Sequence, residues 1–196
     1  AGDFRAVAVG RRDTPGIPYV GIDYASASRE LVLRAAALGH RRAIFVHRSS
    51  LGESVLDRRR GVVEGARENG VELVDRTSDA VDVAGDWAAV RASGATLLIV
   101  EEPSLAAALL EHAAREGVSV PSDLSVVALG SASRPDVDAP ELTRLQPPRA
   151  ELGERAVELL VRILAEGDAV PESDRRILLP CPILDGETLA APAVGR

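Results

Sequence analysis

The sequence predicts an α/β fold built on a doubly wound parallel sheet with helices on both faces. Strand and helix patterns alternate with short links from residue 22 to residue 129, as they do in such sheets. Residues 124–129 form a nearly unbroken apolar run, which is typical of a strand covered on both faces. After a polar loop at residues 130–140, a strand resumes at 142–145, and we place it in a different sheet. We therefore expect two lobes with a cleft between them.

The first half of the chain contains three strand patterns and two helix patterns. Apolar runs predict strands at residues 4–10, 19–22 and 43–46. Leu31, Ala35 and Leu38 fall on one face of a helix over residues 26–38, and Gly39 supplies its C-terminal cap. A second helix, over residues 53–68, has an apolar face of valines and Ala66 and ends at an Asn-Gly pair.

The second half continues the alternation and then changes character. We expect strands at residues 71–74 and 95–100, a short helix at 87–92 and longer helices at 104–116 and 150–166. The last strand region, at 177–184, contains Pro180 and Pro182, which confine it to a sheet edge or to irregular pairing. We expect the tail from Ala190 onwards to be mobile.

Composition excludes several classes of protein. The net charge of −7, without a basic run, makes the chain a poor binder of nucleic acid by itself. The single Cys181 cannot form an internal disulfide, which fits a cytoplasmic protein. There is no long apolar run for a membrane span and no signal peptide pattern. Because the chain has no methionine, we expect a preceding segment to have been removed.

Catalytic and metal-binding patterns are missing from the sequence. The histidines are His40, His47 and His112, and no two stand at the spacing of metal ligands. Cys-x-x-Cys, Gly-x-Ser-x-Gly, the P-loop and Gly-x-Gly-x-x-Gly motifs do not occur. We therefore expect no enzyme, no metal and no cofactor, and a structural role for His40 beside the helix-ending Gly39.

Polar residues follow the predicted strands at the edge where parallel sheets bind ligands. They are Asp23, Glu101, Glu102, Gly130 and Ser131. Arg58, in the first turns of a helix, adds a guanidinium that grips carboxylates or paired hydroxyls.

Two bland alternatives stay open for these positions. Arg58 belongs to the run Arg58-Arg59-Arg60, and charge runs usually line solvated helix faces. Glu101 and Glu102 equally suit a solvated loop, since carboxylates are mostly exposed.

An ordered set of short motifs runs along nearly the whole chain. It comprises VGID at residues 20–23, ALGHRRAIF at 37–45, Arg58-x-x-Gly61 with Ala66, GVSVPSDLSVV at 117–127, PELT at 140–143, QP at 146–147, ELGERAVELL at 151–160 and the closing segment 179–188. Together these motifs resemble the lactose-repressor (LacI/GalR) family of bacterial transcription regulators.

The resemblance implies a type I periplasmic-binding-protein-like fold that binds a small-molecule effector in the cleft and forms a homodimer. It divides the chain into the tail of an N-terminal lobe (1–23), a C-terminal lobe (24–130), a crossover with an N-terminal-lobe helix (131–168) and a return to the C-terminal lobe (169–196). Operator DNA would be bound only through a helix-turn-helix headpiece that this chain does not contain.

We expect the effector site at Arg58, Glu102, Asp23 and Gly130; of the ligand set that the resemblance implies, only Arg58 is retained. Glu102-Pro103 stands where the family usually has Asn-Asp, and Gly130 where it usually has an aspartate. Residues 81–94 are a shorter stretch than usual. Glu102 favours a cationic or donor-rich effector over an ordinary sugar. A sugar-like effector and a cleft that has lost effector control stay open as alternatives.

Two other classes of function remain as alternatives. An extracytoplasmic sugar-binding protein of an ABC transporter shares the fold, and a signal peptide upstream would identify it. A catalytically active relative would need a reactive pair of side chains, which the sequence does not show.

Overall fold

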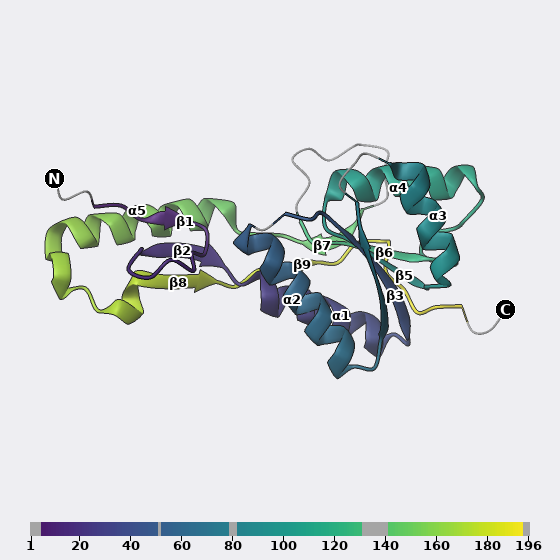
Figure 1. The fold of residues 1–196 in the computed structure, drawn as a ribbon, viewed down its shortest axis with the longest axis horizontal. Coiled ribbons are helices and arrows are strands. Elements are labelled where there is room, and N and C mark those ends of the chain that lie inside the picture. Colours follow the sequence, from purple (N-terminus) through teal and green to yellow (C-terminus); the bar gives the residue numbers. More distant parts are fainter. Residues whose placement is uncertain (1–4, 51, 79–81, 131–140, 194–196) are drawn as a thin grey trace.

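The computed structural model describes residues 5–50, 52–78, 82–130 and 141–193 and divides them into two lobes (Figure 1). The small lobe contains a three-stranded sheet, and the large lobe a six-stranded sheet. The expected start of the first strand at Phe4, the loop at 131–140 with Ser131, and the last three residues of the tail lie outside the described residues.

The large lobe is built on a sheet in the order β4-β3-β5-β6-β7-β9. Its strands are β3 (Arg42–His47), β4 (Glu72–Thr77), β5 (Leu97–Val100), β6 (Ser125–Ala128), β7 (Thr143–Leu145) and β9 (Ile183–Leu184). All neighbours pair in parallel except β7 and β9, which are antiparallel. Every residue of β5 and β6 is buried, as their unbroken apolar runs predict.

Four helices cover both faces of this sheet (Figure 1). On one face, α1 (Tyr24–Ala37) and α2 (Glu53–Glu68) enclose a core around Phe45. On the other, α3 (Val83–Ser93) and α4 (Pro103–Arg115) enclose a core around Trp87. The doubly wound α/β architecture expected from the alternating pattern is therefore confirmed.

The small lobe consists of β1 (Ala8–Val9), β2 (Tyr19–Ile22), β8 (Arg176–Leu179) and the long helix α5 (Arg149–Glu166), followed by the short 3-10 turns η1 (Gly167–Ala169) and η2 (Glu172–Arg175). The strands are parallel in the order β1-β2-β8. Ala156, Leu159 and Ile163 of α5 pack on Val20 and Leu179 of the sheet, so α5 covers one sheet face.

Three segments join the lobes. They connect β2 to α1, β7 to α5 and β8 to β9. Two backbone hydrogen bonds tie the segments together: Asp23 N donates to Leu179 O at 2.8 Å, and Gln146 N donates to Pro182 O at 2.8 Å. The two-lobed body with repeated crossings is thus present, and the crossing segments form one hydrogen-bonded hinge.

The structure corrects the expected positions of two crossings. β7 pairs with β6 in the large sheet, so the chain leaves this sheet after Leu145 and not within the loop before it. β8 pairs with β2 in the small sheet, so the chain returns after Leu179 and not at residue 169. The apolar pattern of a strand does not specify its partner, which is why the sequence missed both.

Three smaller corrections concern local structure. The helix expected at residues 87–92 begins at Val83, because the Asp82 side chain accepts a hydrogen bond from Gly85 N and caps it. Ala190, expected in a mobile tail, accepts a hydrogen bond from His40 at its carbonyl oxygen, and its backbone N–H donates to Ser125 Oγ. The single strand region expected at 177–184 is two strands, β8 and β9, with Pro180 and Pro182 between them, and each lies at a sheet edge, the position that the prolines predict. None of the described helices is long and apolar enough to cross a membrane.

Candidate functional site

Arg58 lies at the junction of the two lobes. Its surroundings decide whether it is a buried binding group or part of a solvated helix face. Its guanidinium carbon lies 4.2 Å from the centre of the Tyr24 ring, a cation–π contact. Its side chain is 16% exposed, whereas those of Arg59 and Arg60 are 48% and 55% exposed. The solvated reading of the arginine run therefore fits Arg59 and Arg60 but is wrong for Arg58.

Glu101 is the acidic partner of Arg58. Its side chain is 4% exposed, and Oε1 lies 3.5 Å from Nη1 of Arg58. Oε2 accepts a hydrogen bond of 2.9 Å from the backbone N–H of Arg48. Glu101 is therefore a buried, paired carboxylate, and the alternative that it sits in a solvated loop is wrong.

Glu102 extends the same group of charges. Its Oε2 lies 3.1 Å from Nη2 of Arg48, with both side chains partly exposed. We call Tyr24, Arg48, Arg58, Glu101 and Glu102 the junction cluster. Among the residues that the structure describes, Arg58 Nε is buried and has no hydrogen-bond partner. An unpaired buried donor is costly, so an acceptor oxygen beside this atom would be stabilising.

The other two expected site residues lie nearby but offer less to a ligand. Asp23 Oδ1 accepts a hydrogen bond of 3.0 Å from Ser26 N, so its carboxylate caps α1. Gly130 is buried, and a Cβ atom there would lie 3.2 Å from Cδ of Pro103. It therefore brings backbone but no side chain to the site.

The sequence did not predict four residues that lie in the junction cluster or close to it. Tyr24 and Arg48 follow candidate strands but belong to no motif. Arg11 of the small lobe and Asp57 of α2 meet beside Arg58, with Arg11 Nε 2.5 Å from Asp57 Oδ2. No local pattern could have revealed that pair, because 46 residues separate its members.

Cys181 lies in the segment that joins β8 to β9. Burial raises the pKa of its thiol to about 11, and the positive charge of nearby Arg58 offsets part of this rise. The thiol is therefore protonated at neutral pH and is a small apolar group beside the cluster.

The cluster combines paired charges with one aromatic ring. Within the described residues, no three His, Cys, Asp or Glu side chains are grouped so that they could hold a metal ion. The cations and carboxylates are paired with one another, and the guanidinium and aromatic ring offer a flat surface with donors at its edge. Such a surface suits a small, oxygen-rich molecule.

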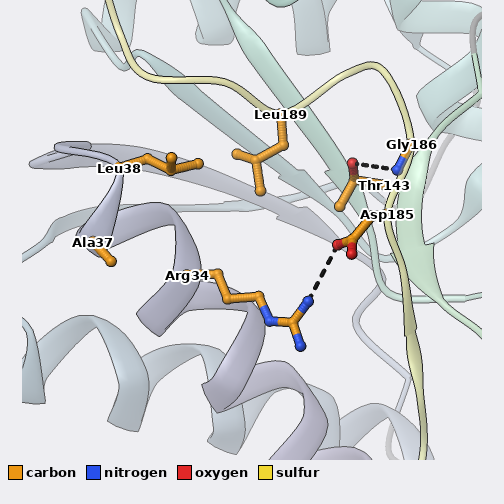
Figure 2. Close-up of a pocket in the computed structure, with 7 residues that line it drawn as sticks. All are labelled: Arg34, Ala37, Leu38, Thr143, Asp185, Gly186 and Leu189. Atoms are coloured by element: carbon orange, nitrogen blue, oxygen red, sulfur yellow. Dashed lines mark hydrogen bonds and ion pairs between the residues drawn. The ribbon is translucent and has the colours of Figure 1, made fainter.

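A hollow lies in the large lobe, at the opposite end of α1 from Asp23. It has a volume of about 430 Å³, and Figure 2 shows Arg34 of α1 reaching across it to Asp185, with Nη1 3.2 Å from Oδ1. Leu38 and Leu189 add apolar surface, and Thr143 on β7 accepts a hydrogen bond from Gly186 N. Because its charged groups pair across it, this pocket offers mainly apolar surface.

Solved structures of similar fold come from several bacteria. A LacI transcriptional regulator from a Rhodococcus species superposes with a TM-score of 0.79 at 20% identity, over 95% of this chain and 70% of that one. A sugar-binding transcriptional regulator of the LacI family from Escherichia coli, complexed with phosphate, gives 0.78 at 18%, over 93% and 67%. A LacI family transcriptional regulator from Enterococcus faecium with bound ribose gives 0.75 at 19%, over 94% and 70%.

A family model fixes the broader relationship. No curated protein sequence is significantly similar to this one. The model of the periplasmic binding protein-like domain, however, matches residues 32–188, which is most of the chain. The chain therefore belongs to the periplasmic binding protein-like domain family and has the fold of the LacI-type transcriptional regulators.

Proposed function

We propose that this chain is the effector-binding region of a LacI-type transcription regulator. A small molecule binds at the junction cluster, between the two lobes, and changes the affinity of the parent protein for operator DNA through the relative position of the lobes. The observation that carries this proposal is Arg58: a nearly buried guanidinium, stacked on Tyr24, with an unpaired Nε at the junction of two hinged lobes.

The charges of the cluster indicate the kind of effector. Glu101 and Glu102 are each paired with an arginine, so neither is left to attract a cationic ligand. Arg58 Nε, in contrast, needs an acceptor oxygen. This favours a sugar-like effector over the cationic one that Glu102 suggests in the sequence. The bound ribose and phosphate of two similar structures are oxygen-rich molecules of this kind.

Binding can be tested by thermal shift against a panel of pentoses, hexoses, sugar phosphates and polyamines. We expect a sugar or sugar phosphate to raise the melting temperature of the wild-type chain. Arg58→Ala should remove that shift and leave folding intact. Arg59→Ala is the matched control, because Arg59 is exposed and pairs with Asp75 away from the cluster. A shift that survives Arg58→Ala, or one that only polyamines produce, would refute the assignment.

The parts of the proposal that concern assembly have their own tests. We propose that the chain forms a homodimer and that DNA binding belongs to a separate headpiece. Light scattering coupled to size-exclusion chromatography should give twice the mass of 20.6 kDa. With a net charge of −7, the chain alone should not retard duplex DNA in a gel-shift assay at physiological salt. Strong retardation would contradict the proposal that DNA binding belongs to a separate headpiece.

A further inference from the structure

An ion pair joins the two lobes directly, away from the three crossing segments. Arg11 follows β1 in the small lobe, and its Nε donates to Oδ2 of Asp57 in the second turn of α2, at 2.5 Å. The Asp57 side chain is 5% exposed and that of Arg11 is 17% exposed. The pKa of Arg11 is raised, chiefly by this hydrogen bond. Charge-assisted hydrogen bonds are stronger than those between neutral groups.

The other partners of this pair stay within their own lobes. Arg60 Nη2 lies 3.0 Å from Oδ1 of Asp57, but both residues belong to α2. Arg11 also contacts Asp13, two residues along the same loop. Of these three contacts, the one between Arg11 and Asp57 depends on the lobes touching. When the lobes part, each of the two charges keeps a local partner. Opening is therefore possible without stranding a buried charge.

A second ion pair, more exposed than the first, also joins an arginine of the small lobe to a carboxylate of α2. Arg12 Nη1 lies 3.1 Å from Oε2 of Glu53, at the start of α2. Its side chains are 42% and 28% exposed, so solvent and salt weaken the interaction more than that of the inner pair.

We propose that Arg11 and Asp57 form a latch that holds the lobes together in the absence of effector. The latch deepens the proposed function, because Asp57 is the residue next to Arg58 on α2. A ligand that draws on Arg58 therefore acts on the same helical turn that carries the latch. The lobes are then in equilibrium between a closed and an open arrangement, and the latch favours the closed one without effector. The effector shifts this equilibrium and does not create the contact between the lobes by itself.

The latch can be tested without any ligand by measuring the distance between the lobes. Spin labels on Glu158→Cys in α5 and Arg115→Cys in α4 report this distance by double electron–electron resonance. Both positions are well exposed, at 64% and 70%. Cys181, buried and with a raised pKa, should take up little label, which the chain without added cysteines verifies.

We expect a single dominant distance in the latched chain and a longer, broader component in Asp57→Asn and in Arg11→Gln. The ratio of closed to open molecules should fall by on the order of tenfold, which corresponds to about 1.4 kcal/mol. Arg60→Gln is the matched control: it removes the partner of Asp57 on the same helix and should leave the distance unchanged. Glu53→Gln should have a much smaller effect than Asp57→Asn.

Two results would overturn the latch. One is a wild-type distance distribution in both Asp57→Asn and Arg11→Gln, each shown to be folded by circular dichroism. The other is an equal opening in Arg60→Gln, which would trace the effect to α2 itself. Neither result bears on ligand binding at Arg58, which the thermal-shift assay tests independently.

Discussion

Gly61 allows α1 and α2 to pack more closely than any other residue would permit. A Cβ atom at this position would lie 2.2 Å from the carbonyl oxygen of Ala25 and 2.8 Å from Cβ of Ser28. One turn later, a Cβ at Gly65 would lie 3.0 Å from Cβ of Val32. The two glycines thus form a groove on α2 into which α1 fits, and they place Asp57 and Arg58 against the first turn of α1.

The cost of Gly61→Ala follows from these distances. Non-bonded heavy atoms are most stable at about 3.5–4.0 Å, so the helices must part by more than ~1 Å. Overpacking of this kind typically costs about 1–3 kcal/mol. Alanine recovers up to ~1 kcal/mol through its better helix propensity. We therefore expect the free energy of unfolding to fall by about 1–2 kcal/mol, and the melting temperature by about 2–8 °C.

Gly153→Ala is the matched control for this experiment. Gly153 is also inside a helix, α5, but its added Cβ would meet no atom within 4 Å. The same substitution there should raise stability by about 0.5–1 kcal/mol, because only the backbone entropy changes. Thermal and urea unfolding followed by circular dichroism measure both variants. If Gly61→Ala proved as stable as Gly153→Ala, the close approach of the two helices would not be a determinant of the fold.

Three further outcomes follow from buried polar groups. Burial lowers the pKa of His40, so below about pH 6.5 the unfolded chain binds a proton that the folded chain does not. The free energy of unfolding should therefore fall as the pH drops from 7 to 5. Urea titrations at each pH should show a smaller dependence of this free energy on pH in His40→Gln. The thiol of Cys181 has a pKa of about 11, so at pH 8 it should react with Ellman's reagent more than ~100-fold slower in the folded chain than in urea. Fast reaction of the folded chain would contradict the burial of this thiol. Thr188→Val removes a hydroxyl that donates a hydrogen bond to Val126 O at 2.6 Å and accepts one from Thr143 N at 3.0 Å. The free energy of unfolding, measured in urea, should fall by about 1–3 kcal/mol. A stability equal to that of the wild type would refute the importance of this bridge.

Elements with complete local signals could be predicted from the sequence. α2 begins at Glu53 and ends at Glu68, and β2 spans Tyr19–Ile22, both as expected. In each case the run of apolar spacing and its stop signal lie within a few residues of one another, so no distant contact is needed to define them. α3 was expected to be shorter because its cap, Asp82, is an ordinary acidic residue until the backbone turns around it.

Sheet membership could not be predicted in the same way. β7 and β8 are short strands of three and four residues, and neither shows in its own composition which sheet it joins. Their places are fixed by pairing: β7 pairs with β6, across the loop that precedes it, and β8 pairs with β2, near the other end of the chain. The topology therefore comes from long-range pairing, which a single sequence does not contain.

The candidate site shows the same limit more sharply, because its chemistry depends on which charges neutralise one another. The sequence presents Arg58, Glu101 and Glu102 as three free charges, and on that basis Glu102 suggests a cationic ligand. In the folded chain both carboxylates already have arginine partners, and the unmatched group is instead the Nε of Arg58. Under the proposed function, this pairing shifts the expected preference from a cationic or donor-rich ligand to one that brings an acceptor oxygen. It follows that Glu102→Gln should change effector affinity far less than Arg58→Ala, although Glu102 departs most visibly from the family pattern.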